Sequence, residues 1–331
     1  MSATPNTTFT HAAEILQRLR DEIAKAMVGQ RDVVEQLLIA IVASGHVLIE
    51  GVPGLGKTLL ARALARSIAL RYARVQFTPD MLPSDITGHA VLDAAPAGSG
   101  SMPALRVRRG PVFTNILLAD EINRAPAKTQ AALLEVMQEY QVTLEGETIA
   151  LARPFFVLAT QNPVETEGTY PLPEAQLDRF LFKIEIGYPS LADEVGVVVR
   201  ATTDQAGDEL PLSKVAPVLN ERAVTSLQAI AARQRVDQQV IDYAVRLTRA
   251  TRDWSGLAQG AGSRGALALV RGARAVALLE GRNFVIPDDI KRVALPALRH
   301  RIALAPDALL EGRKPDDLLS AVIENVSAPR L

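Results

Sequence analysis

Eight consecutive residues carry the clearest chemical signal in this chain of 331 residues. Residues 51–58 read Gly-Val-Pro-Gly-Leu-Gly-Lys-Thr and match the pattern G-x-x-x-x-G-K-[ST] in full. Glycines lack a Cβ, so backbone N–H groups can converge on phosphate oxygens, and a following helix adds its dipole. A chance glycine turn is the alternative, with odds on the order of one in a hundred for a chain of this length. The pattern therefore predicts nucleotide binding.

Two side chains in this loop have distinct expected tasks. Lys57 is expected to reach the outer phosphates, and the Thr58 hydroxyl is expected to ligate Mg²⁺. The predicted nucleotide contacts of this segment are Gly51, Gly54, Leu55, Gly56, Lys57, Thr58 and Leu59.

A pair of adjacent carboxylates supplies the second half of a phosphate-transfer site. Asp120 and Glu121 follow the apolar run 115–119, which is typical of a strand buried on both faces. Ligands in parallel sheets bind at the carboxyl ends of the strands, so both residues should emerge beside the glycine loop. Asp120 would hold the Mg²⁺ shell, and Glu121 would orient or deprotonate the attacking water. Capping of the next helix is a fair alternative for either residue alone and a weak one for both together.

Composition excludes several other classes of protein. The net charge of −1 gives no reason to expect nucleic acid or an anionic membrane as partner. Cysteine is absent, which excludes disulfides, thiol catalysis and cysteine-ligated zinc. No apolar run approaches the ~20 residues that cross a bilayer, and residues 1–10 are polar. We therefore expect a cytoplasmic protein with a flexible N-terminus over residues 1–10.

Apolar strands that alternate with amphipathic helices position these groups. The expected strands are 46–50, 73–78, 115–120, 155–160 and 181–186, which predicts a parallel sheet covered on both faces. Beyond Tyr188 the chain reads as helical, with expected helices at 191–200, 221–233, 237–252, 263–279 and 287–298. The length suggests about two domains of ~150 residues. We place them at residues 11–188 and 189–331.

Two insertions interrupt the α/β pattern. Residues 93–102 are rich in Gly, Ser and Pro and predict a loop or short hairpin. Residues 141–151 predict a β-hairpin, because apolar residues flank the sequence Glu-Gly-Glu at its centre. A polar loop is expected over residues 202–211.

With these motifs in hand, the chain resembles the AAA+ ATPases, and more closely their MoxR family. The resemblance extends from about residue 27 to residue 298 and is carried by stretches 27–30, 51–58, 78–88, 109–113, 118–125, 159–163 and 174–180. It implies an α/β AAA+ P-loop nucleotide-binding domain with a parallel five-stranded sheet, followed by an all-α lid domain. It also implies a homo-oligomeric ring of six subunits. Segment 141–151 looks like the pre-sensor insertion of this branch, and segment 85–108 looks like its insertion within the second helix.

The resemblance also assigns roles to polar residues outside the glycine loop. Asn162 resembles the first sensor, whose amide bonds the γ-phosphate or positions water; a simple turn before Pro163 is the alternative. Arg179 resembles the arginine finger, which acts on the nucleotide of a neighbouring subunit. A surface salt bridge with Asp178 or Glu174 is the alternative for that arginine.

Two further positions follow from the same resemblance. Arg264 resembles the second sensor at the start of a lid helix, although the chain has Gly-Ser-Arg there where the family pattern is Ser-Pro-Arg. Val28, Gly29 and Gln30 look like the contact on the adenine side, with apolar packing as an equal alternative for Val28.

Function follows as an expectation from these residues and the resemblance. ATP and Mg²⁺ are the expected substrate and cofactor. The resemblance implies a chaperone-like remodelling or maturation factor for protein complexes, often with a von Willebrand factor A-domain partner. A nucleic-acid motor of the helicase branch is the alternative, for which Arg106, Arg108 and Arg109 form the only tight basic cluster. A ring contact or a solvated loop is favoured for that cluster, because no aromatic residues interleave with it.

Overall fold

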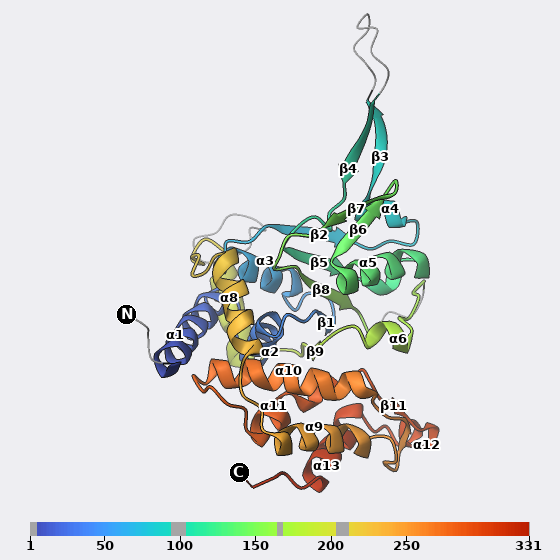
Figure 1. Ribbon diagram of the computed structural model, residues 1–331. Helices are drawn as coiled ribbons and strands as arrows, with labels where there is room; N and C mark the ends of the chain where they lie inside the picture. Colours follow the sequence, from blue (N-terminus) through green and yellow to red (C-terminus); the bar gives the residue numbers. More distant parts are fainter. Residues whose placement is uncertain (1–4, 94–103, 164–167, 203–211, 331) are drawn as a thin grey trace, which may run out of the picture.

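A parallel sheet forms the centre of the molecule, seen in a computed structural model that describes residues 5–93, 104–163, 168–202 and 212–330 (Figure 1). Its strands are β1 (Val47–Glu50), β2 (Tyr72–Gln76), β5 (Ile116–Asp120), β8 (Phe156–Gln161) and β9 (Phe182–Glu185). They lie in the order β2-β5-β8-β1-β9, and every neighbouring pair is parallel. The predicted five-stranded parallel sheet is therefore confirmed, with strand ends within two residues of those expected.

Alternate strand residues face two separate cores. Val47 and Ile49 of β1 pack in one core with the helices α2 (Arg31–Val42) and α3 (Lys57–Ser67). Leu48 packs in the other core, where α5 (Ala127–Glu139) covers the opposite face. Both faces are covered, which is why the inner strands β1, β5 and β8 read as nearly unbroken apolar runs.

Two hairpins leave this α/β body. Helix α4 (Pro83–Thr87) leads into β3 (Gly88–Asp93), which pairs antiparallel with β4 (Ala104–Arg109). Figure 1 shows this pair projecting far beyond the body. The predicted loop at 93–102 lies almost wholly outside the described residues. β6 (Gln141–Leu144) and β7 (Glu147–Ala150) form the second hairpin, as expected. Its two turn residues both have positive φ, which suits the right-handed twist of a tight hairpin.

The N-terminal helix corrects one expectation. Helix α1 (Pro5–Ala24) is already helical over residues 5–10, where a flexible terminus was predicted. Phe9, Ala12, Leu16, Leu19 and Ile23 recur at helical spacing and pack against the main core. The prediction was wrong for residues 5–10 because Phe9 was taken as part of a polar segment, when it is the first residue of this apolar face.

Helices dominate the remainder of the chain. They are α7 (Leu191–Thr202), α8 (Glu221–Ala232), α9 (Gln238–Ala250), α10 (Ser263–Leu279), α11 (Pro287–Leu298), α12 (Pro306–Leu310) and α13 (Pro315–Asn325). The last two were not predicted, and a short two-stranded sheet of β10 (Leu257–Gln259) and β11 (Ala303–Leu304) lies among them. The predicted loop at 202–211 falls outside the described residues except at its first position. None of the described helices has the length and apolarity that a membrane crossing requires.

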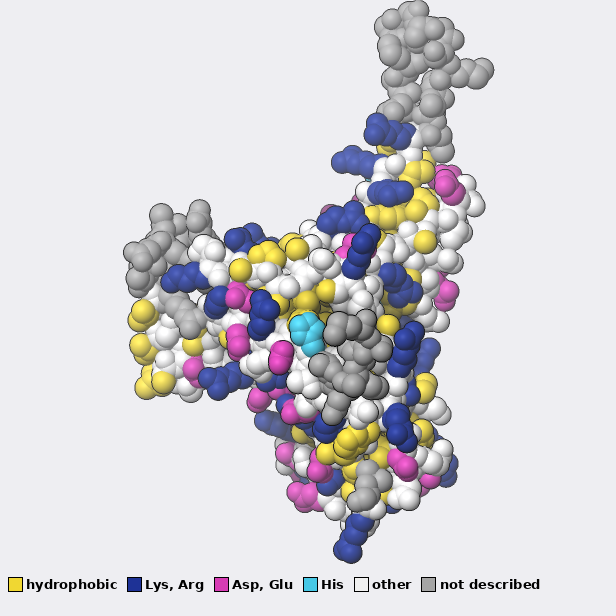
Figure 2. Space-filling view, turned by 60° about the vertical axis from the view of Figure 1, so that its left-hand side comes forward, with side chains coloured by type: hydrophobic (Ala, Val, Ile, Leu, Met, Phe, Trp, Pro, Cys, Tyr) yellow, Lys and Arg dark blue, Asp and Glu magenta, His cyan; other side chains and the backbone are white. Residues whose placement is uncertain are grey.

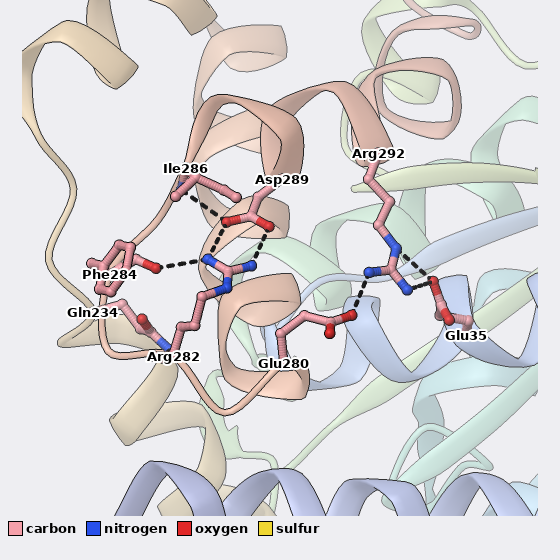
Figure 3. A network of polar contacts seen from close by, with 8 residues as sticks. All are labelled: Glu35, Gln234, Glu280, Arg282, Phe284, Ile286, Asp289 and Arg292. Atoms are coloured by element: carbon pink, nitrogen blue, oxygen red, sulfur yellow. Dashed lines mark hydrogen bonds and ion pairs between the residues drawn. The ribbon is translucent and has the colours of Figure 1, made fainter. Parts of the chain in front are cut away.

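The C-terminal helices pack directly against the sheet domain. The aromatic ring of Phe182 on β9 lies 2.9 Å from where a Cβ on Gly272 of α10 would stand, so only glycine permits this approach. Figure 3 shows a polar contact at the same boundary, where Arg292 of α11 donates to Glu35 of α2 at 2.8 Å and to Glu280 at 2.6 Å. One core cluster runs through both regions, so a division at Tyr188 stays a prediction.

Candidate active site

The glycine loop joins β1 to α3 at the carboxyl edge of the sheet. Gly54 and Gly56 have φ values of +87° and +79°, which side-chain-bearing residues rarely adopt. A Cβ on Gly51 would lie 2.7 Å from the carbonyl oxygen of Ile186. Glycine is therefore required in this pattern for two reasons: two positions have positive φ, and a third lies too close to the backbone of Ile186 for a Cβ. The backbone of this loop and the first turn of α3 offer N–H groups to an anion.

Lys57, the first residue of α3, lies over this loop. Its Nζ donates to the carbonyl oxygen of Gly51 at 2.7 Å. Burial lowers the pKa of Lys57, and the carboxylates of Asp120, Glu121 and Glu50 oppose that shift. The three carboxylates therefore lie close enough to Lys57 for their charges to stabilise its protonated form. The other predicted loop contacts lie around it: Leu55 and Leu59 pack partly against the core, and Thr58 is the second residue of α3.

Residues 28–30 lie between the loop and α7. The Cε of Met27 is 3.6 Å from where a Cβ on Gly56 would stand, which places this segment beside the glycine loop. The Nε2 of Gln30 donates to the carbonyl oxygen of Gly187 at 3.0 Å. The structure thus brings the predicted adenine-side segment to the loop.

Val28 and Gly29 face the first turns of α7. The Cγ1 of Val28 lies 3.4 Å from where a Cβ on Gly196 would stand. Gly29 has φ +71°, and a Cβ there would lie 2.6 Å from the side chain of Asp193. The adenine-side role of Val28 and the alternative of apolar packing both stay predictions.

Asp120 ends β5 and is buried. Its Oδ1 accepts from the Thr160 hydroxyl at 2.6 Å, and its Oδ2 accepts from Arg74 at 2.7 and 3.1 Å. Arg74 comes from β2, which pairs directly with β5. A cation of the chain itself is therefore held against the carboxylate that was predicted to serve Mg²⁺.

Glu121 follows in a strained conformation. Its φ of 55° and ψ of 50° place a non-glycine residue in the left-handed region, at a cost of about 1–3 kcal/mol. Its N–H donates to the Thr160 hydroxyl at 2.9 Å, and its Oε2 accepts from Gln76 at 2.7 Å and from Arg124 at 2.9 Å. The surrounding contacts fix the carboxylate, as expected for strain held at a functional site.

Asn162 directly follows β8 and so reaches the same edge. The residue before it, Gln161, donates to Glu50 at the end of β1, and Glu50 also pairs with Lys183 of β9. Two neighbouring strands, β8 and β1, therefore end in linked polar side chains, and a lysine near the start of β9 reaches them. The structure places the glycine loop, the two carboxylates and the predicted first sensor at one edge of the sheet.

Arg179 and Arg264 lie at the opposite edge. Both line a cavity of about 280 Å³ together with residues 44–46, which precede β1, and residues 180–181, which precede β9. A four-residue strand such as β1 spans roughly 13 Å. The structure therefore does not bring these two arginines to the glycine loop of their own chain.

The contacts of Asp178 organise this amino edge. Its Oδ1 accepts from Nε of Arg301 at 2.7 Å, and its Oδ2 lies 3.6 Å from Nη1 of Arg264. Burial lowers the pKa of Arg301, and Asp178 opposes the shift. Among the described residues no ion pair joins Arg179 to Asp178 or Glu174, the alternative raised for that arginine.

Two buried histidines stand at this edge. The Nε2 of His46 contacts the carbonyl oxygen of Met137 at 3.1 Å, and its Nδ1 accepts from the N–H of Val157 at 3.0 Å. Burial lowers the pKa of His46 to about 4. Burial and then Arg301 lower the pKa of His300 well below its usual value. Both rings are therefore neutral at pH 7.

Several residues of the site were missed by reading the sequence. They are Arg74, Gln76, Arg124, Thr160 and Arg301. A partial signal exists on β2, where Arg74 and Gln76 alternate with apolar residues. Their contacts with the carboxylates depend on β2 lying next to β5, which no local pattern states.

Comparisons with known proteins find family matches in both parts of the chain. Residues 46–182 match the ATPase family associated with various cellular activities (AAA), and residues 249–322 match the AAA lid domain. The first range holds the glycine loop, both carboxylates, Asn162 and Arg179. The second holds Arg264 and Arg301.

Relatives with similar lengths are also found. The chain is 43% identical to the chaperone MoxR1 of Mycobacterium tuberculosis over 97% of its own length and 84% of that protein. It is 36% identical to the protein MoxR of Methylorubrum extorquens, over 94% of each chain. A crystal structure from Cytophaga hutchinsonii, described as a candidate ATPase, superposes with a TM-score of 0.87 at 39% identity and covers 97% of both chains.

Proposed function

This chain belongs to the MoxR family of AAA+ ATPases, and we propose that it hydrolyses ATP to ADP and phosphate in a Mg²⁺-dependent reaction. The convergence of Lys57, Asp120 and Glu121 behind one glycine loop carries this proposal. A lysine, a metal-holding carboxylate and a water-orienting carboxylate are the parts that phosphoryl transfer to water requires.

The residues present suit both ATP and Mg²⁺. Oxygen ligands are what Mg²⁺ prefers, and Thr58 and Asp120 would hold it. Arg74 already pairs with Asp120, so the position favours positive charge. When bound, the ion would neutralise charge on the β- and γ-phosphates. The open positive-φ turn at Gly54, where an added Cβ meets nothing within 4 Å, leaves room beside the loop.

Glu121 is the group that acts on the attacking water. Gln76 and Arg124 hold its carboxylate, and the Thr160 hydroxyl accepts its N–H. This arrangement fixes the direction of the carboxylate before substrate arrives, which reduces the reorganisation needed in the transition state. Asn162 would hydrogen-bond the γ-phosphate or the water from the adjacent strand.

Arg179 and Arg264 act on the nucleotide of a neighbouring subunit. Their position at the amino edge of the sheet supports this, because their own glycine loop lies at the other edge. Such a head-to-tail contact closes into a ring when the rotation between subunits permits it, and we propose a hexamer. Guanidinium groups suit the γ-phosphate through planar, charge-assisted bonds.

Chaperone-like remodelling of a protein complex is the cellular role we propose. It is supported by the name of the mycobacterial relative, a chaperone. A von Willebrand factor A-domain partner and a cytoplasmic location stay predictions. One observation favours the alternative of a nucleic-acid motor: Arg106, Arg108 and Arg109 are exposed on the projecting hairpin, where Figure 2 shows basic side chains.

Two substitutions test the ATPase proposal. Lys57→Ala should abolish ATP binding, because the lysine holds the ground-state phosphates. Glu121→Gln should bind ATP normally and lose turnover by a factor of about 10²–10⁴, because this carboxylate acts only on water. Nucleotide binding by fluorescence and phosphate release under saturating ATP measure the two effects. Wild-type hydrolysis in Glu121→Gln would refute the assignment.

The same hydrolysis-blocked variant separates the two cellular roles. Glu121→Gln loaded with ATP should retain its protein client in a pull-down, and Lys57→Ala should not. Duplex and single-stranded DNA should bind wild type no more tightly than about 10⁻⁶ M at physiological salt, the level of non-specific contacts. Nanomolar DNA affinity with DNA-stimulated hydrolysis would favour the motor.

A further inference from the structure

Arg301 fastens the segment that carries Arg179. Its Nε donates to the Asp178 carboxylate at 2.7 Å, and its Nη2 donates to the carbonyl oxygens of Phe180 at 2.6 Å and Asp178 at 3.1 Å. Its Nη1 donates to the carbonyl oxygen of Leu181 at 3.2 Å. These bonds fall on both sides of Arg179, so the backbone at that residue is held from either end.

The burial of these groups divides them into an inner and an outer set. The side chain of Arg301 is 3% exposed, whereas that of Arg264 is 50% exposed. Asp178 stands between the two arginines, with one carboxylate oxygen turned to each. The inner arginine can therefore keep its partner while the outer one is reached from solvent.

The charge around the cavity is unbalanced. Its lining includes Arg179, Arg264, Arg271 and Arg301 against one carboxylate, that of Asp178. An anion that approaches this face meets excess positive charge. A phosphate oxygen can take over from Asp178 as the partner of Arg264, because their separation of 3.6 Å is a loose contact.

We propose that Asp178 and Arg301 are positioning residues that hold Arg179 and Arg264 in place for the γ-phosphate of a neighbouring subunit. This assignment rests on the ATPase function proposed above. Arg301 lies beyond the end of α11, and Asp178 lies just before β9, so the C-terminal helices set the position of a catalytic group in the sheet domain. Neither residue is required to touch the substrate.

Arg301→Gln is the direct test. A misplacement of about 1 Å can lower a rate by about 10². We therefore expect kcat for ATP to fall about 10²-fold, with KM and ATP affinity unchanged, because nucleotide is bound at the other edge of the sheet. A wild-type kcat in Arg301→Gln would overturn the proposal.

Rings that contain two different variants show whether Arg301→Gln impairs the arginine face or the nucleotide site. Subunits with Arg301→Gln keep an intact nucleotide site, and subunits with Glu121→Gln keep an intact arginine face. Mixing the two should restore part of the hydrolysis. Absence of recovery, when Arg179→Ala does recover in the same mixture, would show that Arg301 acts on its own nucleotide site and would overturn the proposal. If Arg179→Ala instead kept full activity, the proposed action of Arg179 on a neighbouring subunit's nucleotide would be refuted.

Two further variants exclude a simple loss of folding. The double variant Asp178→Asn with Arg301→Gln removes both charges of the pair, so it should recover the thermal stability that Arg301→Gln loses while kcat stays low. A return of kcat along with stability would overturn the positioning role. Arg282→Gln is the matched control: Arg282 forms a partly buried pair with Asp289 through two bonds of 2.6 and 2.9 Å (Figure 3). It should lose stability and keep kcat.

Discussion

The two edges of the central sheet carry different halves of the proposed reaction. At the carboxyl edge, the glycine loop, Lys57 and the adjacent carboxylates gather within one chain. At the amino edge, arginines surround a single carboxylate. Because strands are rigid and roughly 13 Å long, neither half can swing to the other. With this division of residues, the proposed site is complete only where two chains meet.

The edges also differ in how their charges are held. At the carboxyl edge, Arg74 pairs with Asp120 and is 46% exposed, and Lys57 rests on a backbone carbonyl. Incoming ATP and Mg²⁺ can displace such partners. At the amino edge, Arg301 is buried and makes several bonds at once. Asp120 and Lys57 at the first edge can thus exchange partners, whereas Arg301 at the second edge keeps its own, which suits a preorganised charge.

Among the variants that test this comparison of the two edges, Arg179→Ala should have the largest effect. We expect kcat to fall by on the order of 10³ with ATP affinity nearly intact, because the lost charge acts on the transition state of a neighbour. Mixed with Glu121→Gln subunits, this variant should regain activity at interfaces that join the two intact halves. Steady-state hydrolysis at several mixing ratios and protein concentrations measures both the fall in kcat and the recovery. Full activity of dilute monomers, with no recovery on mixing, would mean that Arg179 acts on the nucleotide of its own chain or has no part in hydrolysis.

The carboxyl edge could be predicted because its signals are local. The glycine loop, the strand before it and the pair Asp120-Glu121 are each contiguous in sequence, and parallel sheets place ligands at one edge. Arg74 could not be assigned, because its contact with Asp120 joins residues 46 positions apart through an unpredicted strand order. The strained backbone of Glu121 likewise arises from contacts made only in the folded chain.

The amino edge was predictable only through resemblance. Arg179 and Arg264 were named by family position, and nothing in their local sequence places them near each other. The bond from Arg301 to Asp178 spans 123 residues, and a charged residue after an amphipathic helix ordinarily indicates a solvated end. The short strands β10 and β11 were missed for a related reason, since two or three residues carry no periodicity.

Acid should weaken the fold through the buried histidine at the amino edge. The pKa of His46 is lowered from 6.5 to about 4, so the unfolded chain binds a proton that the folded chain refuses between these pH values. The stabilisation is complete above pH 6.5 and is lost as pH falls towards 4, by about 3 kcal/mol. His300 adds to the loss in the same direction.

His46→Gln is the variant that isolates this contribution. The amide can donate to Met137 and accept from Val157, as the neutral ring does. Urea unfolding between pH 7.5 and 4 should show a shallower fall in the free energy of unfolding for the variant than for the wild type. Identical slopes would mean that His46 is protonated in the folded chain and that this edge is more open to solvent than its packing indicates.

Arg292→Gln should have the smallest effect, a small loss in the free energy of unfolding. It compares an exposed ion pair with the buried pair of Arg301. Arg292 ties α11 to Glu35 of α2 (Figure 3), but its side chain is 38% exposed. Glu35 also pairs with Arg20 at 3.2 Å. Exposed pairs contribute about 0.2–1 kcal/mol, and salt screens them. Chemical unfolding at 0.05 M and 1 M salt should show a small loss at low salt that disappears at high salt. A loss as large as that of Arg301→Gln, or one insensitive to salt, would mean that this contact fixes the C-terminal helices as firmly as the buried arginine does.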